Sequence, residues 1–188
     1  MTKLLTERRG KGLSPEQFIA TMTKNKEQFQ DFYNQFIWRN EDDRDYFASL
    51  NHRDDLHCFI LAADWCGDVI RNVPVVLQAL KDSGIPTEIL IQEQHMDVMD
   101  EFLTLGGRAI PIVIFTDTGG FVLGHWGPRP KYIQEPMVQF KKDNPDRNAA
   151  TYETNLQETR KQIIARYGTG TEYHQWIVDE LRELISGF

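Results

Sequence analysis

One cysteine in this chain stands where a thiol can do chemistry. Cys66 follows a short apolar run, residues 58–63, which is typical of a fully buried strand, and a helical pattern begins directly after it. A thiol at such a junction lies near the unpaired N–H groups and the positive end of the helix dipole, which favour the thiolate. Because the thiolate is the reactive form of cysteine, Cys66 is the candidate catalytic nucleophile.

The other cysteine, Cys58, lies inside the apolar run, where free cysteines are commonly buried. An extended strand from Cys58 to Ala63 spans about 16 Å, whereas the two Cα atoms of a disulfide lie within about 7 Å. We therefore expect no disulfide between Cys58 and Cys66. Neither cysteine has a partner at C-x-x-C spacing and no two of the five histidines are four residues apart, so we expect no metal site.

The segment around Cys66 resembles the active-site loop of the thioredoxin superfamily. Residues 63–67 read Ala-Asp-Trp-Cys-Gly, and the family pattern is Trp-Cys-Gly-x-Cys. Further landmarks follow in the family's order: Pro74 in the next helix, the Gly-Arg-Ala-Ile-Pro segment 107–111, which is similar to the segment with the family's cis-proline, and Gly127 after the last strand. The resemblance covers roughly residues 56–130 and implies a thioredoxin-like fold.

The chain departs from the family at two positions that bear on the chemistry. Val69 stands where the second active-site cysteine belongs, and Ile60 stands where thioredoxins bury an aspartate that helps this second cysteine to ionise. The two losses are consistent with each other, because a buried carboxylate has less to do without a resolving thiol. The protein is therefore not expected to be a standard dithiol thioredoxin.

The resemblance also implies which residues bind the substrate. The backbone of Ile110, before Pro111, offers an N–H and a C=O to an extended substrate, as in β-strand addition. Trp65 supplies an apolar contact surface, and Gly67 and Asp68 complete the loop. The expected partner is a protein or a low-molecular-weight thiol or disulfide, with no cofactor.

Two carboxylates flank the thiol, Asp64 and Asp68. Like-charge repulsion raises the pKa of a thiol, whereas the helix N-terminus lowers it. Asp68 also suits a helix N-cap or first-turn position. We expect the thiolate of Cys66 to be less favoured than in a standard thioredoxin.

Length and composition predict one globular domain spanning 1–188. A chain of 188 residues buries a core large enough to be stable without disulfides. The net charge of −7 disfavours binding to nucleic acid or to an anionic membrane, and no apolar stretch is long enough to span a membrane. The polar N-terminus, residues 1–10, lacks the apolar core of a signal peptide, so we expect a cytoplasmic protein whose thiols stay reduced.

The apolar periodicity predicts an α/β fold, and the resemblance implies that it is a thioredoxin-like three-layer arrangement with a central mixed sheet, extended by N-terminal and C-terminal helices. The core covers about 56–130, the N-terminal helical extension 14–50, and the C-terminal helices 148–187. The expected elements are an aromatic-faced helix from Ser14 through 37, helices at 41–50, 66–83, 94–105, 148–167 and 171–186, and strands at 58–63, 87–91, 111–115 and 121–123. Residues 128–147 read as a Pro-rich irregular segment with a short helix at about 136–141.

The leading functional hypothesis is a monothiol redox or thiol–disulfide exchange role through Cys66. In this chemistry Cys66 forms a mixed disulfide that an external thiol resolves, which would make the protein a monothiol thiol–disulfide oxidoreductase. Two alternatives remain open. Cys66 could ligate a shared iron–sulfur cluster, as in some monothiol glutaredoxins. Alternatively, the chain is a non-catalytic protein-binding or scaffold module, in which the aromatic N-terminal helices and segment 128–147 form contact surfaces.

Overall fold

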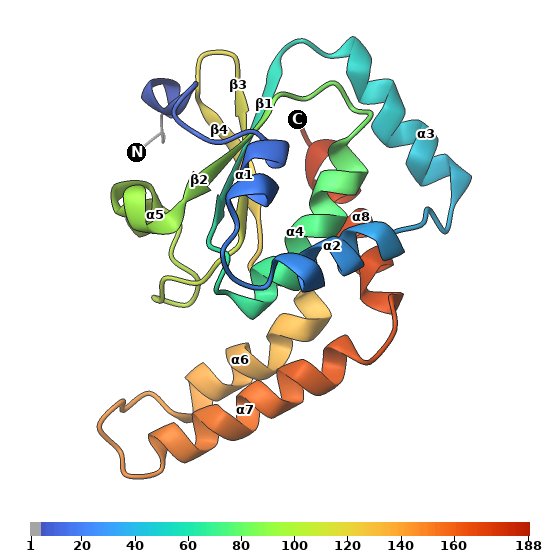
Figure 1. Ribbon diagram of the computed structural model, residues 1–188. Coiled ribbons are helices and arrows are strands. Elements are labelled where there is room, and N and C mark those ends of the chain that lie inside the picture. Colours follow the sequence, from blue (N-terminus) through green and yellow to red (C-terminus); the bar gives the residue numbers. More distant parts are fainter. Residues whose placement is uncertain (1–4) are drawn as a thin grey trace.

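The computed structural model describes residues 5–188, which form a four-stranded mixed sheet flanked by helices (Figure 1). The strand order is β2-β1-β3-β4, made of β1 (Leu56–Ala62), β2 (Thr87–Ile91), β3 (Ile112–Asp117) and β4 (Val122–Trp126). β1 pairs parallel to β2 and antiparallel to β3, and β3 pairs antiparallel to β4. The α/β fold with a central mixed sheet is thus confirmed.

The strand β1 lies in the middle of the core. Every one of its seven residues is buried, which requires that both faces of the sheet be covered. α4 (Gly67–Leu80) connects β1 to β2, because parallel neighbours need such a crossover. α2 (Lys26–Gln35) packs on α4, so the helix that begins at Cys66 is enclosed on its outer side.

Of the two C-terminal helices, α8 (Glu172–Ile185) packs on the core, in contact with α4 and β4. α7 (Tyr152–Tyr167) instead pairs with α6 (Lys131–Asp143), and the two form a hairpin that projects away from the sheet (Figure 1). The prediction that residues 128–147 form an irregular segment was wrong, because most of this segment is α6. Pro136 deprives the carbonyl of Tyr132 of its helical donor, and the guanidinium of Arg166 on α7 donates to that carbonyl instead.

The prediction of a single aromatic-faced helix up to residue 37 was also wrong, because this stretch forms two helices, α1 (Pro15–Thr21) and α2. α1 begins with a capping box, in which the Ser14 hydroxyl accepts from the N–H of Gln17 and the Gln17 side chain accepts from the N–H of Ser14. The break is at Asn25, whose φ of +56° is left-handed. Phe18 and Phe29 from the two helices are buried with their rings in edge contact.

The remaining elements lie close to the expected positions. α3 (Glu41–Ser49) agrees with the second predicted helix, whereas α5 (Met96–Glu101) is shorter than expected and ends before a tight turn at residues 104–107. Short 3-10 helices cover Thr6–Arg8, Leu50–His52 and Gln92–Gln94. Within residues 5–188, no helix has both the length and the apolar character that crossing a membrane requires.

Gly127 brings the end of β4 against the start of β3. Its φ is +119°, and a Cβ added there would lie 2.2 Å from the carbonyl oxygen of Pro111. No side chain fits in that space, because the atom in the way belongs to the backbone. Gly106 also has a positive φ, of +73°, but open space around it, and so offers a comparison without a backbone clash.

We expect Gly127→Ala to lower the free energy of unfolding by about 3 kcal/mol or more, because it adds a backbone clash to the strain of a positive φ. Gly106→Ala, which carries only the strain, should cost about 1–2 kcal/mol. Urea denaturation of both variants measures the difference. Equal losses would show that the close approach to Pro111 is not a constraint.

Candidate functional site

Cys66 is the N-cap residue of α4, at the junction where the sequence placed it. Its side chain is half-buried, and its thiol donates to the carbonyl oxygen of Ile110 with a sulfur–oxygen distance of 3.5 Å. The peptide bond between Ile110 and Pro111 is cis. The structure therefore brings together Cys66, Ile110 and Pro111 from segments 44 residues apart.

The pKa of the Cys66 thiol is raised above its ordinary value. Burial is the largest cause, and the negative charge of Asp68 adds to it. The backbone N–H groups of Val69 and Asp68 and the charge of Arg129 act in the opposite direction. Burial therefore outweighs the N–H groups at the helix N-terminus, and the thiol form predominates at neutral pH. That the thiolate is less favoured than in a standard thioredoxin stays a prediction.

Asp68 lies in the first turn of α4, one of its two expected positions, while Cys66 is the N-cap residue. Its carboxylate accepts two hydrogen bonds from the guanidinium of Arg129, at 2.8 and 2.6 Å, and one from the hydroxyl of Tyr167 at 2.8 Å. Only 17% and 14% of the Asp68 and Arg129 side chains are exposed. Two N–H groups of one guanidinium thus donate to the two oxygens of one carboxylate, and this bidentate arrangement is among the stronger charge-assisted hydrogen bonds.

A buried amide connects α4 to the same two segments a second time. The Asn72 side chain donates to the carbonyl of Pro128 at 2.9 Å and to the hydroxyl of Tyr167 at 2.8 Å. Burial and the neighbouring Asp68 raise the pKa of Tyr167, so its phenol stays protonated and donates to the carboxylate. The start of α4 is thus tied to the segment after β4 and to α7.

Sequence reasoning missed Arg129, Tyr167 and Asn72 as parts of the site. Asn72 lies one helical turn after Asp68, and this spacing could have pointed to a shared face. Arg129 follows Gly127 and Pro128, a segment already marked by the resemblance. Tyr167 carries no comparable signal, because it comes from a helix 99 residues further along the chain.

Asp64 does not act on the thiol as expected. Its carboxylate accepts from the backbone N–H groups of Thr23 and Lys24, at 2.8 and 3.0 Å, in the loop that separates α1 from α2. Burial alone would raise the pKa of Asp64, but these donors outweigh it and hold that pKa below its ordinary value. Asp64 therefore anchors the N-terminal helices to the active-site loop.

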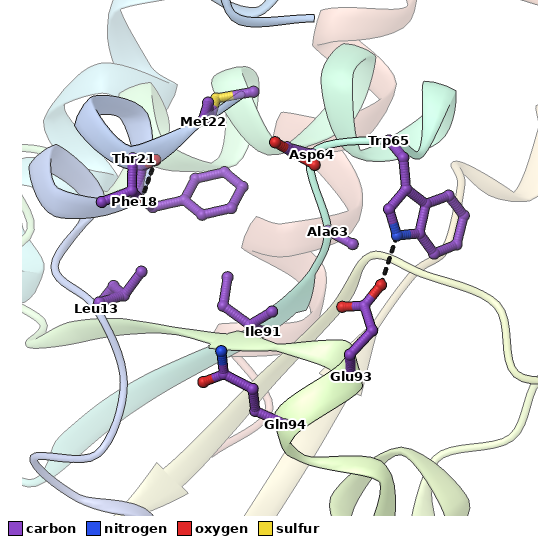
Figure 2. Close-up of a pocket in the computed structure, with 10 residues that line it drawn as sticks. All are labelled: Leu13, Phe18, Thr21, Met22, Ala63, Asp64, Trp65, Ile91, Glu93 and Gln94. Atoms are coloured by element: carbon purple, nitrogen blue, oxygen red, sulfur yellow. Dashed lines mark hydrogen bonds between the residues drawn. The ribbon is translucent and has the colours of Figure 1, made fainter. Parts of the chain in front are cut away.

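Trp65 projects from the loop with half of its surface exposed. Its indole N–H donates to the carboxylate of Glu93 at 2.5 Å, as Figure 2 shows. Beside it lies a pocket of about 430 Å³, whose apolar wall includes Leu13, Phe18 and Ile91. The Trp65 ring is therefore held at the rim of a partly apolar pocket next to Cys66.

A second pocket, of about 400 Å³, has Gly67 and Asp68 in its lining. Cys58, in contrast, is fully buried in β1, and burial raises the pKa of its thiol. Both cysteines are free, so no disulfide joins them. In the part of the chain that the structure describes, no three His, Cys, Asp or Glu side chains are grouped to hold a metal ion.

Comparison with known proteins identifies the family. A family model described as Thioredoxin matches residues 12–145, which extends the similarity beyond 56–130 into the N-terminal helices and α6. A crystal structure of a protein of unknown function from Pseudomonas aeruginosa is similar over 94% of this chain and 93% of its own, with 15% identity and a TM-score of 0.60. An HIV epitope-scaffold shares 16% identity over 94% of this chain and 99% of its own, with a TM-score of 0.49. No curated protein matches the chain.

The charges around Cys66 predict opposite effects of two substitutions on the pKa of its thiol. Asp68→Asn removes a raising charge and leaves Arg129, so the pKa should fall, and Arg129→Gln should raise it. Asp64→Asn is the matched control, because it removes an equal charge that is directed to the α1–α2 loop. The measurement is the pH dependence of Cys66 alkylation. Equal shifts in Asp64→Asn and Asp68→Asn would contradict the assignment.

Proposed function

Because the chain belongs to the thioredoxin family, we propose that it is a monothiol thiol–disulfide exchange protein with Cys66 as its nucleophile. One observation carries the proposal: the Cys66 thiol lies at the N-cap of α4, half-buried, against the carbonyl of Ile110 and beside Pro111. Val69, fully buried, occupies the place of a second thiol, so a resolving group must come from outside the chain.

The exchange has two balanced steps. The Cys66 thiol gives its proton to solvent, and the thiolate attacks one sulfur of a disulfide, forming the Cys66 mixed disulfide as the old sulfur–sulfur bond breaks. The leaving thiolate takes a proton from solvent. An external thiolate then attacks the substrate's sulfur in the mixed disulfide, forms a new disulfide, and releases Cys66 as a thiolate that is reprotonated.

The residues around Cys66 support this role in distinct ways. Deprotonation of the thiol frees the Ile110 carbonyl, which can then accept an N–H from a substrate backbone lying along Pro111. Trp65 offers its exposed ring as a contact surface, and Gly67 and Asp68 form the opposite rim. The proposal places the protein in the cytoplasm, in keeping with two free cysteines.

The raised pKa of Cys66 sets the pH dependence of the reaction. A thiol with a higher pKa has less thiolate at neutral pH, but each thiolate is a stronger nucleophile, because nucleophilicity increases with basicity. The observed rate should therefore rise with pH until the pH passes the raised pKa. Slow exchange at neutral pH is part of the proposal.

The test is intact-mass analysis after incubation with hydroxyethyl disulfide, an uncharged probe. We expect one adduct on the native protein, formed faster as the pH rises, reversed by an added thiol and absent in Cys66→Ser. The buried Cys58 should react only after unfolding. Absence of an adduct at any pH at which the protein stays folded would overturn the proposal.

A non-catalytic binding module is the second candidate. Two observations favour it: the raised pKa of Cys66, which keeps the thiol protonated, and the half-exposed Trp65 beside an apolar-walled pocket. Under this alternative, Cys66→Ser would leave the protein's interactions intact, whereas Trp65→Ala would weaken them.

A further inference from the structure

We infer that the pocket between α4 and α7 binds the anionic part of the disulfide, so that the preferred substrates are small disulfides that carry carboxylates. The inference rests on the proposed function and specifies its substrate class. The pocket of about 400 Å³ is within the size range of small-molecule sites, and its lining includes Gly67 and Asp68, the two residues that follow Cys66 in the chain.

The charge of this pocket is opposite to that of the chain. Its lining includes the three arginines Arg71, Arg129 and Arg160, with Asp68 as the one carboxylate, in a protein whose net charge is −7. Asp68 is engaged by Arg129 and by Tyr167. The lining therefore offers two further guanidinium groups, on Arg71 and Arg160, to a negatively charged ligand.

Arg71 is held in place by aromatic rings instead of by a carboxylate. Its guanidinium carbon lies 5.3 Å from the ring centre of Phe32 and 5.1 Å from that of Tyr167. Among residues 5–188, no acidic side chain forms an ion pair with it. Because stacking uses the flat faces of a guanidinium, its N–H groups remain to bind a carboxylate in the bidentate manner that suits arginine.

Arg160 is available for a ligand in a different way. It lies 3.9 Å from the Glu153 carboxylate, and both side chains are more than half exposed. Such a surface pair contributes little to stability and exchanges readily for a better partner. Arg160 can therefore turn to an anion in the pocket at small cost.

The same pocket has an apolar wall made by Ile163 and Ile164, the second of which is 61% exposed. A wall of this kind suits the methylene groups that separate a carboxylate from a sulfur in a small disulfide. With the carboxylate on the arginines, the inference directs the disulfide sulfur toward Cys66, the residue that precedes Gly67 of the lining in the chain. The exchange then follows the two balanced steps above, with no further reactant.

The test compares two disulfides of opposite charge. We measure the rates at which glutathione disulfide, an anionic probe, and cystamine, a cationic probe, form adducts on Cys66. We expect glutathione disulfide to react faster with the wild type. In the double variant Arg71→Gln/Arg160→Gln the ratio of the two rates should fall about tenfold, the equivalent of one charge-assisted hydrogen bond.

Lys161→Gln is the matched control, since it removes a positive charge next to Arg160 on an exposed side chain outside the pocket lining. Its rate ratio should equal that of the wild type. The rate with hydroxyethyl disulfide, measured on every variant, reports the intrinsic reactivity of Cys66 and the integrity of the fold. An unchanged glutathione disulfide to cystamine ratio in the double variant, with normal hydroxyethyl disulfide reactivity, would overturn the inference and leave the proposed function standing.

A second measurement tests whether the pocket binds an anion, independently of disulfide exchange at Cys66. Calorimetric titration of Cys66→Ser with S-methylglutathione, which keeps the carboxylates and cannot exchange, should show binding that is lost on adding Arg71→Gln/Arg160→Gln. If no disulfide reacts with the wild type, the proposed function fails, and this titration alone decides the anion site. Equal binding of S-methylglutathione with and without the two arginines would overturn the inference of an anion site.

Discussion

The ion pair between Asp68 and Arg129 joins the parts of this molecule that make the site. It ties the first turn of α4 to the segment after β4, and Tyr167 adds α7 through the same carboxylate. Removing one partner from a pair this well buried leaves a poorly solvated charge and costs several kcal/mol, on the order of 3–5. The pair therefore fixes the position of the α6–α7 hairpin relative to the thiol, and with it the shape of the cationic pocket.

The same pair determines how the thiol is charged. Asp68 lies close enough to repel a thiolate, and Arg129, bound to it, offsets part of that repulsion. Burial is a larger influence than either charge, and it raises the pKa of Cys66. Under the proposed function this protonated thiol becomes a strong nucleophile once deprotonated, and the buried Val69 and Ile60 stand where thioredoxins have a second thiol and a buried carboxylate.

Features that depend on local sequence were predictable. The buried strand before Cys66, the helix after it and the capping box at Ser14 follow from periodicity and cap chemistry within a few residues. The contact between Cys66 and Ile110 joins distant segments, and only the family resemblance pointed to it. It could not be derived from spacing.

The wrong predictions about segment 128–147 and about Asp64 share one physical cause, which is that a distant group supplies the partner. Pro136 reads as a helix breaker until Arg166 is seen to satisfy the carbonyl that it leaves free. Asp64 and Asp68 look equivalent in the sequence, but Thr23 and Lys24 hold one away from the thiol, and Arg129 holds the other beside it. Such partners follow from the tertiary fold and not from neighbours along the chain.

The most direct test of the central claim is a turnover measurement. The rate of exchange between reduced glutathione and hydroxyethyl disulfide is followed with wild-type protein, with Cys66→Ser and without protein. The account predicts an acceleration proportional to the concentration of wild-type protein, increasing with pH, and no acceleration by Cys66→Ser. Equal rates with the wild type and Cys66→Ser would contradict it and show that the single thiol does not catalyse exchange.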